Sequence, residues 1–467
     1  MNIFTIEFKL DSKEPLYKQL YDFIIQEIKT QNLKEGEKLP SKRALANHLK
    51  ISINTVETAY EMLVTEGYVQ SRNRSGFYVC LLEKLDVTEK SKKQFIFEKE
   101  VKKNYKYDFK TNVVDTSTFP YSTWAKITKE IIYNSPELLQ HGDRQGDYCL
   151  REVLAKYLHE FRGVNCIPEQ IIMGAGMEYL MSLITEILGN SAIFAFENPG
   201  YSKIYKIIKN NERKVNPIKV DDDGMCLVDL KNTNSNIAYI TPSHQFPMGA
   251  VMPIGKRIEL LKWANLKDDR YIIEDDYDSE FRFNGKPIPS LQGLDENGKV
   301  IYVSTFSRSI APSIRVAYMV LPPRLLEIYH KNFSFYSSTI SRMEQHTISR
   351  FIDEGHFSRH INRMKNIYRI RKETLVDCIK KSRLNEYVKI IGANAGLHLI
   401  LKVDNGMSEK ELVESAERVD IRVYGLSEYC ISNQKYIGDN MVVLGYSGLL
   451  PDEITQAVEL LNKAWIK

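Results

Sequence analysis

The sequence predicts a multidomain chain: a small domain of three helices and a hairpin, then a large α/β domain, then a smaller α+β part. The length of 467 residues exceeds that of one ordinary domain. Up to residue 80, apolar residues recur at the spacing of short helices, whereas beyond Asp108 short β-branched and apolar runs alternate with helical stretches. This alternation is typical of a mainly parallel sheet with helices on both faces.

The overall composition excludes several classes of protein. No apolar run approaches the roughly 18 residues that span a bilayer, so we expect no membrane role. The first residues lack the apolar core and cleavage site of a secretory signal, which favours a cytoplasmic location. Six scattered cysteines show neither CxxC pairs nor metal-ligand spacing, so free thiols and no metal site are expected. The formal net charge of +4 is too small to indicate nucleic-acid binding by itself.

Three short helices are predicted in the first part of the chain. Apolar residues from Pro15 to Ile28 recur at helical spacing and form one face to bury. Ser41 is a favourable N-cap for a second helix, and Ser52 caps a third, which we expect to stop at Gly67.

A hairpin follows these helices, because two short alternating runs, YVQS and GFYV, flank the polar stretch RNRSG. Three helices and a hairpin make a winged helix-turn-helix, in which the third helix enters the major groove while the second helix and the hairpin tip reach phosphates. A lone arginine is more often solvated surface, but the ordered set favours DNA binding. The predicted base-edge or sugar contacts are Asn54, Thr55 and Thr58, the phosphate or groove contacts are Arg43, Arg72 and Arg74, and Ser52 and Gly76 complete the DNA site.

The run LPSKRALANHLKISINTVETAYEMLVTEGYV resembles the GntR family of regulators, with its LPS-x-R-x-LA, S-x-x-TV and L-x-x-x-G pattern, over residues 12 to 80. The resemblance implies double-stranded operator DNA as a partner. Two positions differ: Ile53 stands where many relatives have arginine, and Glu57 is acidic where some relatives are basic. We therefore expect affinity to depend more on the wing and on the avidity of a dimer.

The predicted organisation is a DNA-binding domain at residues 1–80, a lysine- and glutamate-rich tether at residues 81–107, and a body at residues 108–467. Within the body, long helical stretches begin near residue 343 and lead to short strands and helices. We expect a smaller α+β subdomain there, at about residues 343–467.

Several strand ends of the body carry side chains that suit a flat, phosphorylated ring. The glycine turn in IIMGAGMEYL favours a phosphate at a helix start, although such a turn is more often only a tight connection. Tyr201 ends ENPGY and offers an aromatic face. Asp275 and Tyr277 follow a buried-looking strand, so the carboxylate could pair with a pyridine nitrogen or could instead be paired structurally inside the fold. The run TFSRSIAPSIR offers two hydroxyls and two arginines, a fitting phosphate clamp.

Taken in order, these pieces resemble the fold-type I aminotransferases that use pyridoxal 5'-phosphate, over residues 108 to 467. With the first domain, the chain resembles the MocR branch of the GntR family, whose aminotransferase-like domain binds an effector. That resemblance implies a homodimer and a small-molecule effector. It places Gly176 and Met177 at a phosphate turn, Tyr201 at the stacking position, Asp275 and Tyr277 at the ring nitrogen and ring hydroxyl, and Thr305, Ser307 and Arg315 at further phosphate contacts.

Arg308 stands where that family has its cofactor-binding lysine. A guanidinium stays protonated and cannot form a Schiff base, so pyridoxal 5'-phosphate is expected only as a non-covalent ligand. Met177 replaces a frequent phosphate-binding hydroxyl, and Val443 replaces the arginine that clamps substrate carboxylates, so we expect no catalysis. Three hypotheses for Arg308 remain open: it binds a phosphorylated or acidic effector, it forms a structural ion pair with Asp275, or it is an engineered replacement of a natural lysine.

The leading prediction is a transcriptional regulator of the GntR/MocR type, with a DNA-binding domain and a dimerising body that senses a small molecule without a Schiff base. A ligand can act only through different affinities for two arrangements of the domains. One alternative is a pyridoxal 5'-phosphate-dependent aminotransferase with an attached DNA-binding module. Another is a purely structural body that dimerises the DNA-binding domains and senses nothing.

Overall fold

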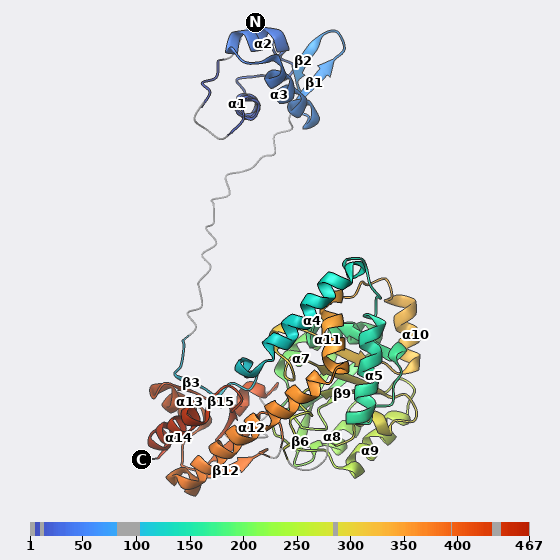
Figure 1. The fold of residues 1–467 in the computed structure, drawn as a ribbon, viewed down its shortest axis with the longest axis vertical. Helices are drawn as coiled ribbons and strands as arrows, with labels where there is room; N and C mark the ends of the chain where they lie inside the picture. Colours follow the sequence, from blue (N-terminus) through green and yellow to red (C-terminus); the bar gives the residue numbers. More distant parts are fainter. Residues whose placement is uncertain are drawn as a thin grey trace. The chain divides into compact units, whose positions relative to one another are not determined.

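The computed structural model describes residues 5–9, 14–81, 103–283, 288–393, 395–431 and 440–466. The chain divides into two compact units, Met1–Val101 and Lys102–Lys467, and each encloses its own hydrophobic core (Figure 1). Most of the predicted tether at residues 81–107 lies outside the described residues.

The first unit is a winged helix-turn-helix, as the sequence predicts. Its elements are α1 (Leu16–Lys29), α2 (Lys42–Leu49), α3 (Ile53–Thr65), β1 (Val69–Arg72) and β2 (Gly76–Val79). Both predicted caps are confirmed, because the Ser41 hydroxyl accepts from the backbone N–H of Ala44 at 3.2 Å and that of Ser52 accepts from Thr55 at 3.0 Å. β1 and β2 pair antiparallel to form the wing.

The second unit is built on an eight-stranded sheet of order β4-β11-β10-β9-β8-β5-β6-β7. Its strands are β4 (Ile171–Gly174), β5 (Ile193–Asn198), β6 (Lys214–Asp221), β7 (Gly224–Met225), β8 (Ile237–Ile240), β9 (Tyr271–Asp276), β10 (Val300–Thr305) and β11 (Ala317–Val320). From β10 to β6 every neighbouring pair is parallel, which confirms the predicted mainly parallel sheet. β11 differs, because it runs antiparallel to both β10 and β4.

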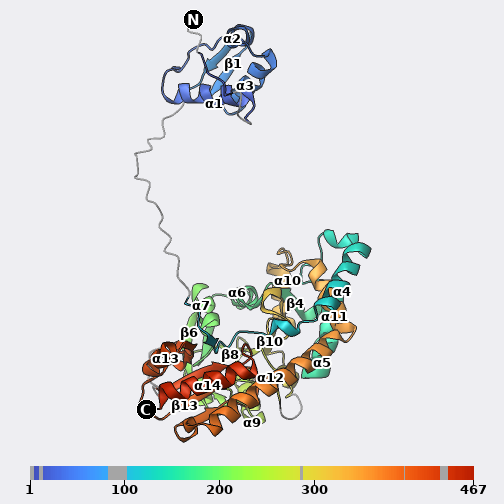
Figure 2. The same ribbon diagram turned by 60° about the vertical axis from the view of Figure 1, so that its left-hand side comes forward.

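Helices cover both faces of this sheet (Figure 2). One apolar layer joins the sheet to α6 (Met177–Ile187), α7 (Ser202–Asn210) and α10 (Pro323–Asn332). The other joins it to α8 (Leu227–Lys231) and α9 (Ile254–Asn265), with Trp263 among its fully buried side chains.

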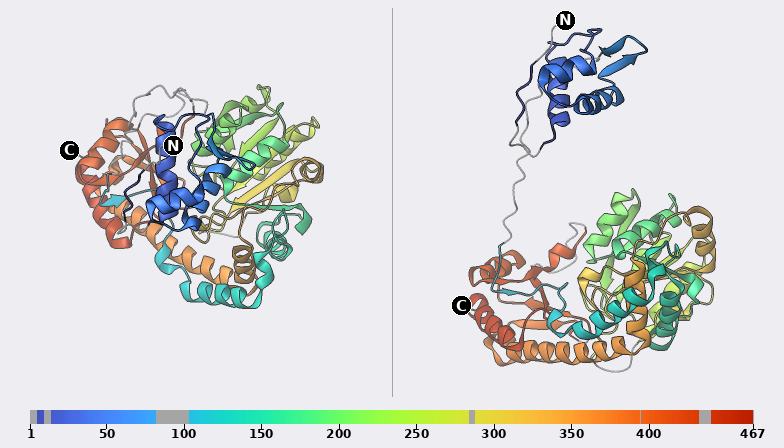
Figure 3. Two further views of the ribbon diagram at one scale, coloured as in Figure 1. Left: turned by 90° about the horizontal axis from the view of Figure 1, so that it is seen from above. Right: turned by 45° about the horizontal axis from the view of Figure 1, so that its top comes forward.

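After the larger sheet, the long helix α12 (His356–Lys381) leads to a smaller sheet (Figure 3). It contacts α11 (Arg342–Asp353), which packs on α4 (Tyr121–Asn134) and α5 (Tyr148–Arg162), the two long helices that precede the larger sheet in the chain. The smaller part holds β12 (Val388–Ile391), β13 (His398–Val403), β15 (Tyr424–Gly425) and β16 (Met441–Gly445), paired antiparallel, together with α13 (Glu409–Arg418) and α14 (Pro451–Trp465). Among the described residues, no helix combines the length and apolarity needed to cross a membrane.

The first residues of the body belong to this smaller part, which the sequence does not predict. β3 (Tyr107–Asp108) pairs in parallel with β14 (Ile421–Arg422). Just beyond it, the backbone N–H of Gly445 donates to the carbonyl of Phe109 at 2.8 Å. The chain therefore enters the second unit beside its last sheet and only then passes to the larger sheet.

Candidate functional site

The exposed start of α3 holds the predicted base contacts. Asn54 and Thr58 are exposed and Thr55 is half-buried. The Thr55 hydroxyl lies 2.8 Å from that of Ser52, and the Thr58 hydroxyl donates to the carbonyl of Asn54 at 2.9 Å. The hydroxyls therefore rigidify this turn, and Asn54 presents its amide to solvent.

The two unusual positions of α3 also lie on its accessible side. The side chain of Ile53, the first residue of the helix, is 44% exposed, which is high for an isoleucine in a packed domain. Glu57 pairs with Lys42, the first residue of α2, at 2.5 Å. Because Lys42 neutralises it, Glu57 does not present an isolated negative charge to DNA.

The predicted phosphate contacts lie on the surface of the first unit. Arg43 on α2 and both Arg72 and Arg74 on the wing are exposed. The guanidinium of Arg72 lies 4.4 Å from the centre of the Tyr78 ring, which holds it against the hairpin. Gly76 has a φ of +112°, and a Cβ there would lie 3.1 Å from the side chain of Lys38, so the end of the turn requires glycine.

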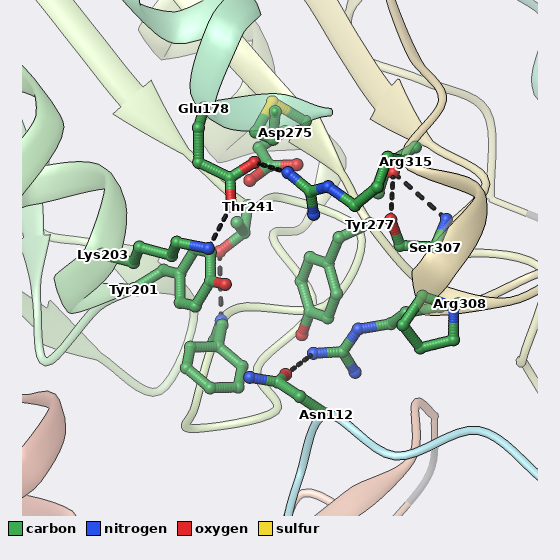
Figure 4. A pocket seen from close by; sticks show the side chains of 14 residues that line it. Asn112, Glu178, Tyr201, Lys203, Thr241, Asp275, Tyr277, Ser307, Arg308 and Arg315 are labelled. Carbon is green, nitrogen blue, oxygen red and sulfur yellow. Dashed lines mark hydrogen bonds and ion pairs between the residues drawn. The ribbon is translucent and has the colours of Figure 1, made fainter. Parts of the chain in front are cut away.

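The second unit contains a cavity of about 220 Å³ at the carboxyl ends of β5, β8, β9 and β10 and beside the start of α6 (Figure 4). Its lining residues are Asn112, Met177, Glu178, Tyr201, Lys203, Thr241, Phe246, Asp275, Tyr277, Thr305, Ser307, Arg308, Pro312 and Arg315. These include every predicted cofactor contact except Gly176. Gly176 lies behind Arg315, since a Cβ at position 176 would collide with that guanidinium.

Asp275, the residue before the last of β9, is a buried carboxylate with one oxygen free of hydrogen bonds from the described residues. Its Oδ2 accepts a hydrogen bond from the hydroxyl of Tyr239 on β8, while its Oδ1 has no partner among the described residues. Burial raises the pKa of Asp275 to about 7, although the bond from Tyr239 opposes this rise. The free oxygen suits a ring N–H donor. Sequence reasoning missed Tyr239, because a tyrosine inside an apolar strand carries no functional signal.

Aromatic side chains form the walls around this carboxylate. The ring of Tyr201 meets that of Phe246 edge-on, with centroids 5.6 Å apart. The hydroxyl of Tyr277 donates to the carbonyl of His244 at 2.9 Å, and the Nδ1 atom of His244 lies 3.0 Å from Asp278. Because the Tyr277 hydroxyl already donates its hydrogen to the His244 carbonyl, it can only accept a hydrogen bond from a ligand.

Arg308 lies against the ring of Tyr277 on the wall of the pocket. Its guanidinium carbon is 4.7 Å from the centre of the Tyr277 ring, and its Nη2 donates to Oδ1 of Asn112 at 2.9 Å. Its Nη1 is buried without a hydrogen-bond partner among the described residues. The structural ion pair with Asp275, one of the three hypotheses from the sequence, is not formed. Asn112 was missed because it comes from a loop without any motif.

At the opposite end of the pocket, Arg315 already pairs with a carboxylate. Glu178, the second residue of α6, forms ion pairs with both Arg315 and Lys203 (Figure 4). The Thr305 and Ser307 hydroxyls lie 2.9 Å apart beside them. Burial alone would raise the pKa of Glu178, but hydrogen bonds from Lys203, its own backbone N–H and Arg315 lower it to about 2. Glu178 is therefore ionised at the place where the sequence predicts a phosphate.

Both units match known families. Residues 16–79 match the bacterial regulatory proteins of the gntR family, and residues 106–430 match aminotransferase class I and II. The uncharacterized HTH-type transcriptional regulator YdeL of Bacillus subtilis (strain 168) is 40% identical over 97% of each chain. The probable rhizopine catabolism regulatory protein MocR of Rhizobium meliloti is 30% identical over 98% of this chain and 95% of MocR.

Among solved structures, Pyrococcus horikoshii kynurenine aminotransferase superposes with a TM-score of 0.68 at 23% identity, covering 78% of this chain and 91% of that one. This likeness shows a shared fold.

An aminotransferase class I and II domain suggests pyridoxal 5'-phosphate as a ligand. The ring end of the pocket fits such a ligand, because Asp275 keeps a free oxygen between aromatic walls. The phosphate end, with Glu178 on Arg315, does not fit a phosphate as it stands.

Proposed function

We propose a ligand-sensing role for this chain, which belongs to the HTH-type transcriptional regulators of the MocR type, with a gntR-family domain before an aminotransferase class I and II domain. Its body binds a small ring compound without forming a covalent bond to it. The observation that carries the proposal is Arg308, which lines the pocket where an aminotransferase of this fold needs an amine.

Arg308 supports binding but not catalysis. A guanidinium holds its proton to a pH above about 12, so it offers no free electron pair to an aldehyde and shuttles no proton. Its unpartnered Nη1 is instead a donor for an oxygen or anion of the ligand. Asp275 receives a ring N–H at the other side, and the aromatic side chains of Tyr201 and Phe246 exclude water from the ring. We therefore assign pyridoxal-like compounds to this pocket as non-covalent ligands, and the body is not an enzyme.

The competing function, a transaminase with an attached DNA-binding module, would need another amine in the pocket. Lys203 is the lysine among the lining residues. Its Nζ pairs with Glu178, and its side chain is 54% exposed. This ion pair engages the Lys203 side chain at the anion end of the pocket, so Lys203 is not assigned as a nucleophile.

DNA binding belongs to the first unit, and we assign dimerisation to the second. Ile132 and Tyr133 at the end of α4 and Leu139 just beyond it are all exposed. Neighbouring exposed apolar side chains of this size suit burial against a second copy. Two copies would carry two winged helices, which suits an operator with two half-sites.

The test combines two measurements on the full-length protein. A mobility shift with the DNA upstream of its own gene should show a specific complex that weakens steeply with salt. Titration with pyridoxal, followed by borohydride reduction and mass spectrometry, should show saturable binding but no covalent adduct. A reduced adduct on Lys203 would instead support the enzymatic function, and the lack of a specific DNA complex would contradict operator recognition by this domain.

A further inference from the structure

The anion end of the pocket carries an inference that deepens the proposed function and rests on it. Three donors converge there: the guanidinium of Arg315, the ammonium of Lys203 and the backbone N–H groups at the start of α6. Such a set is suited to a dianionic phosphate. In this chain the donors converge on a side chain of the protein itself.

Glu178 already occupies both side-chain donors of this set. One carboxylate oxygen pairs with Lys203 and the other with Arg315. Its own backbone N–H also contributes to the lowered pKa of this carboxyl. The three groups come from different elements, since Glu178 lies on α6, Lys203 on α7 and Arg315 in the loop between β10 and β11. The arrangement is therefore a tertiary cluster and not a local helix pair.

The backbone around this cluster is shaped for close packing. Arg315 adopts a φ of +55°, which is unusual for a residue with a side chain. Its guanidinium lies against Gly176, where a Cβ would overlap Nη2. Gly176 thus opens room for Arg315 to reach Glu178, in addition to forming the turn before the helix.

We propose that Glu178 fills the phosphate subsite and makes the pocket select unphosphorylated ring ligands over their phosphorylated forms. A phosphate would have to displace the carboxylate from Arg315 and leave two like charges beside one another. An unphosphorylated ring meets no such obstacle, because it needs only Asp275, the aromatic walls and Arg308. The Asp275 carboxylate and the unpartnered Nη1 of Arg308 belong to this ring end of the pocket.

The test compares two ligands that differ only by the phosphate, pyridoxal and pyridoxal 5'-phosphate, by calorimetry on the full-length protein. In Glu178→Gln, an isosteric change, we expect the affinity for pyridoxal 5'-phosphate to rise about tenfold or more, the size of one charged interaction gained. Pyridoxal affinity should change less than about twofold. Glu186→Gln is the matched control, because it removes the same charge from an exposed position in the last turn of α6.

Each outcome bears on one claim. An unchanged ratio of the two affinities in Glu178→Gln overturns the selectivity proposal but leaves the proposed function intact. If pyridoxal binds neither protein, inorganic phosphate is the next probe. Phosphate binding gained only by Glu178→Gln supports the subsite and contradicts the assigned ring ligand. Phosphate binding by neither protein overturns the subsite. Thermal denaturation of all three proteins checks that they are folded.

Discussion

The guanidinium of Arg308 lies 4.7 Å from the centre of the Tyr277 ring and donates to Asn112 at 2.9 Å. A cation on an aromatic face, with one further hydrogen bond, holds a charge in place without a carboxylate partner. Asp275 is thereby left with a free oxygen, and the pocket keeps a donor and an acceptor for a ligand. This arrangement leads to predictions that separate binding from chemistry.

Replacing Arg308 with lysine should restore covalent chemistry in an otherwise suitable site. An amine at position 308 can form a bond with an aldehyde, whereas a guanidinium cannot. Incubation of Arg308→Lys with pyridoxal should give a borohydride-reducible adduct at this position, detected by peptide mass spectrometry. Arg308→Gln is the control and should give none. If Arg308→Lys binds pyridoxal but forms no adduct, the ring does not lie beside position 308.

The buried carboxylate of Asp275 should make stability depend on pH. Burial raises its pKa to about 7 in the folded protein, against about 4 for an exposed aspartate. The folded state therefore holds this proton more tightly than the unfolded state, and ionisation of Asp275 destabilises the fold increasingly from pH 4 to 7. Asp275→Asn should gain stability over the wild type through this window, by up to about 4 kcal/mol, and the gain should level off above pH 7.

Urea denaturation at several pH values measures that difference. Asp353→Asn, which removes an exposed carboxylate from α11, controls for the loss of one charge. A difference between wild type and Asp275→Asn that stays constant from pH 4 to 8 would contradict the raised pKa of Asp275.

The exposed side chain of Ile53 predicts a readable feature of the operator. If α3 enters the major groove as the sequence predicts, an exposed apolar side chain at its start suits the methyl group of thymine. Uracil lacks the methyl group of thymine, so the test replaces dT by dU at one operator position at a time. We expect binding to weaken about fourfold at one position per half-site, because that is the contribution of one buried methyl group. Ile53→Ala should bind both DNAs equally. Equal loss from dU at every position, or none at any, would exclude this contact.

The wing arginines should contribute charge rather than sequence specificity. Arg72 and Arg74 are exposed on the hairpin, so each alanine variant should weaken binding to all DNA sequences to a similar degree. The slope of log affinity against log salt should fall by about one for each arginine–phosphate pair that is removed. Lys410→Ala on α13 removes an exposed positive charge from the other unit and should leave the slope unchanged. A variant that alters the preferred sequence instead would place its arginine at a base edge.

The architecture follows from local patterns, and the site follows only in part. Helix periodicity, the caps at Ser41 and Ser52 and the alternation of strands and helices are properties of neighbouring residues, and they predict both units. Asp275 and Arg308 are also visible, because they lie at or just beyond the ends of apolar strands. The pairing of Glu178 with Arg315 is not, since residues 137 positions apart meet only in three dimensions. An acidic residue in a first helical turn is common for reasons of helix stability alone.

The pairing of β3 with β14 determines where the connecting chain leaves the second unit. Because β3 and β14 form a two-stranded sheet within the smaller part, a rotation of that part relative to the larger sheet would move the start of the second unit with it. In a dimer, the distance between the two points at which the connecting chains begin would influence the effective concentration of one winged helix at its half-site once the other is bound. If the body dimerises and senses a ligand as proposed, ligand binding would change this distance, and operators would respond differently according to the spacing of their half-sites.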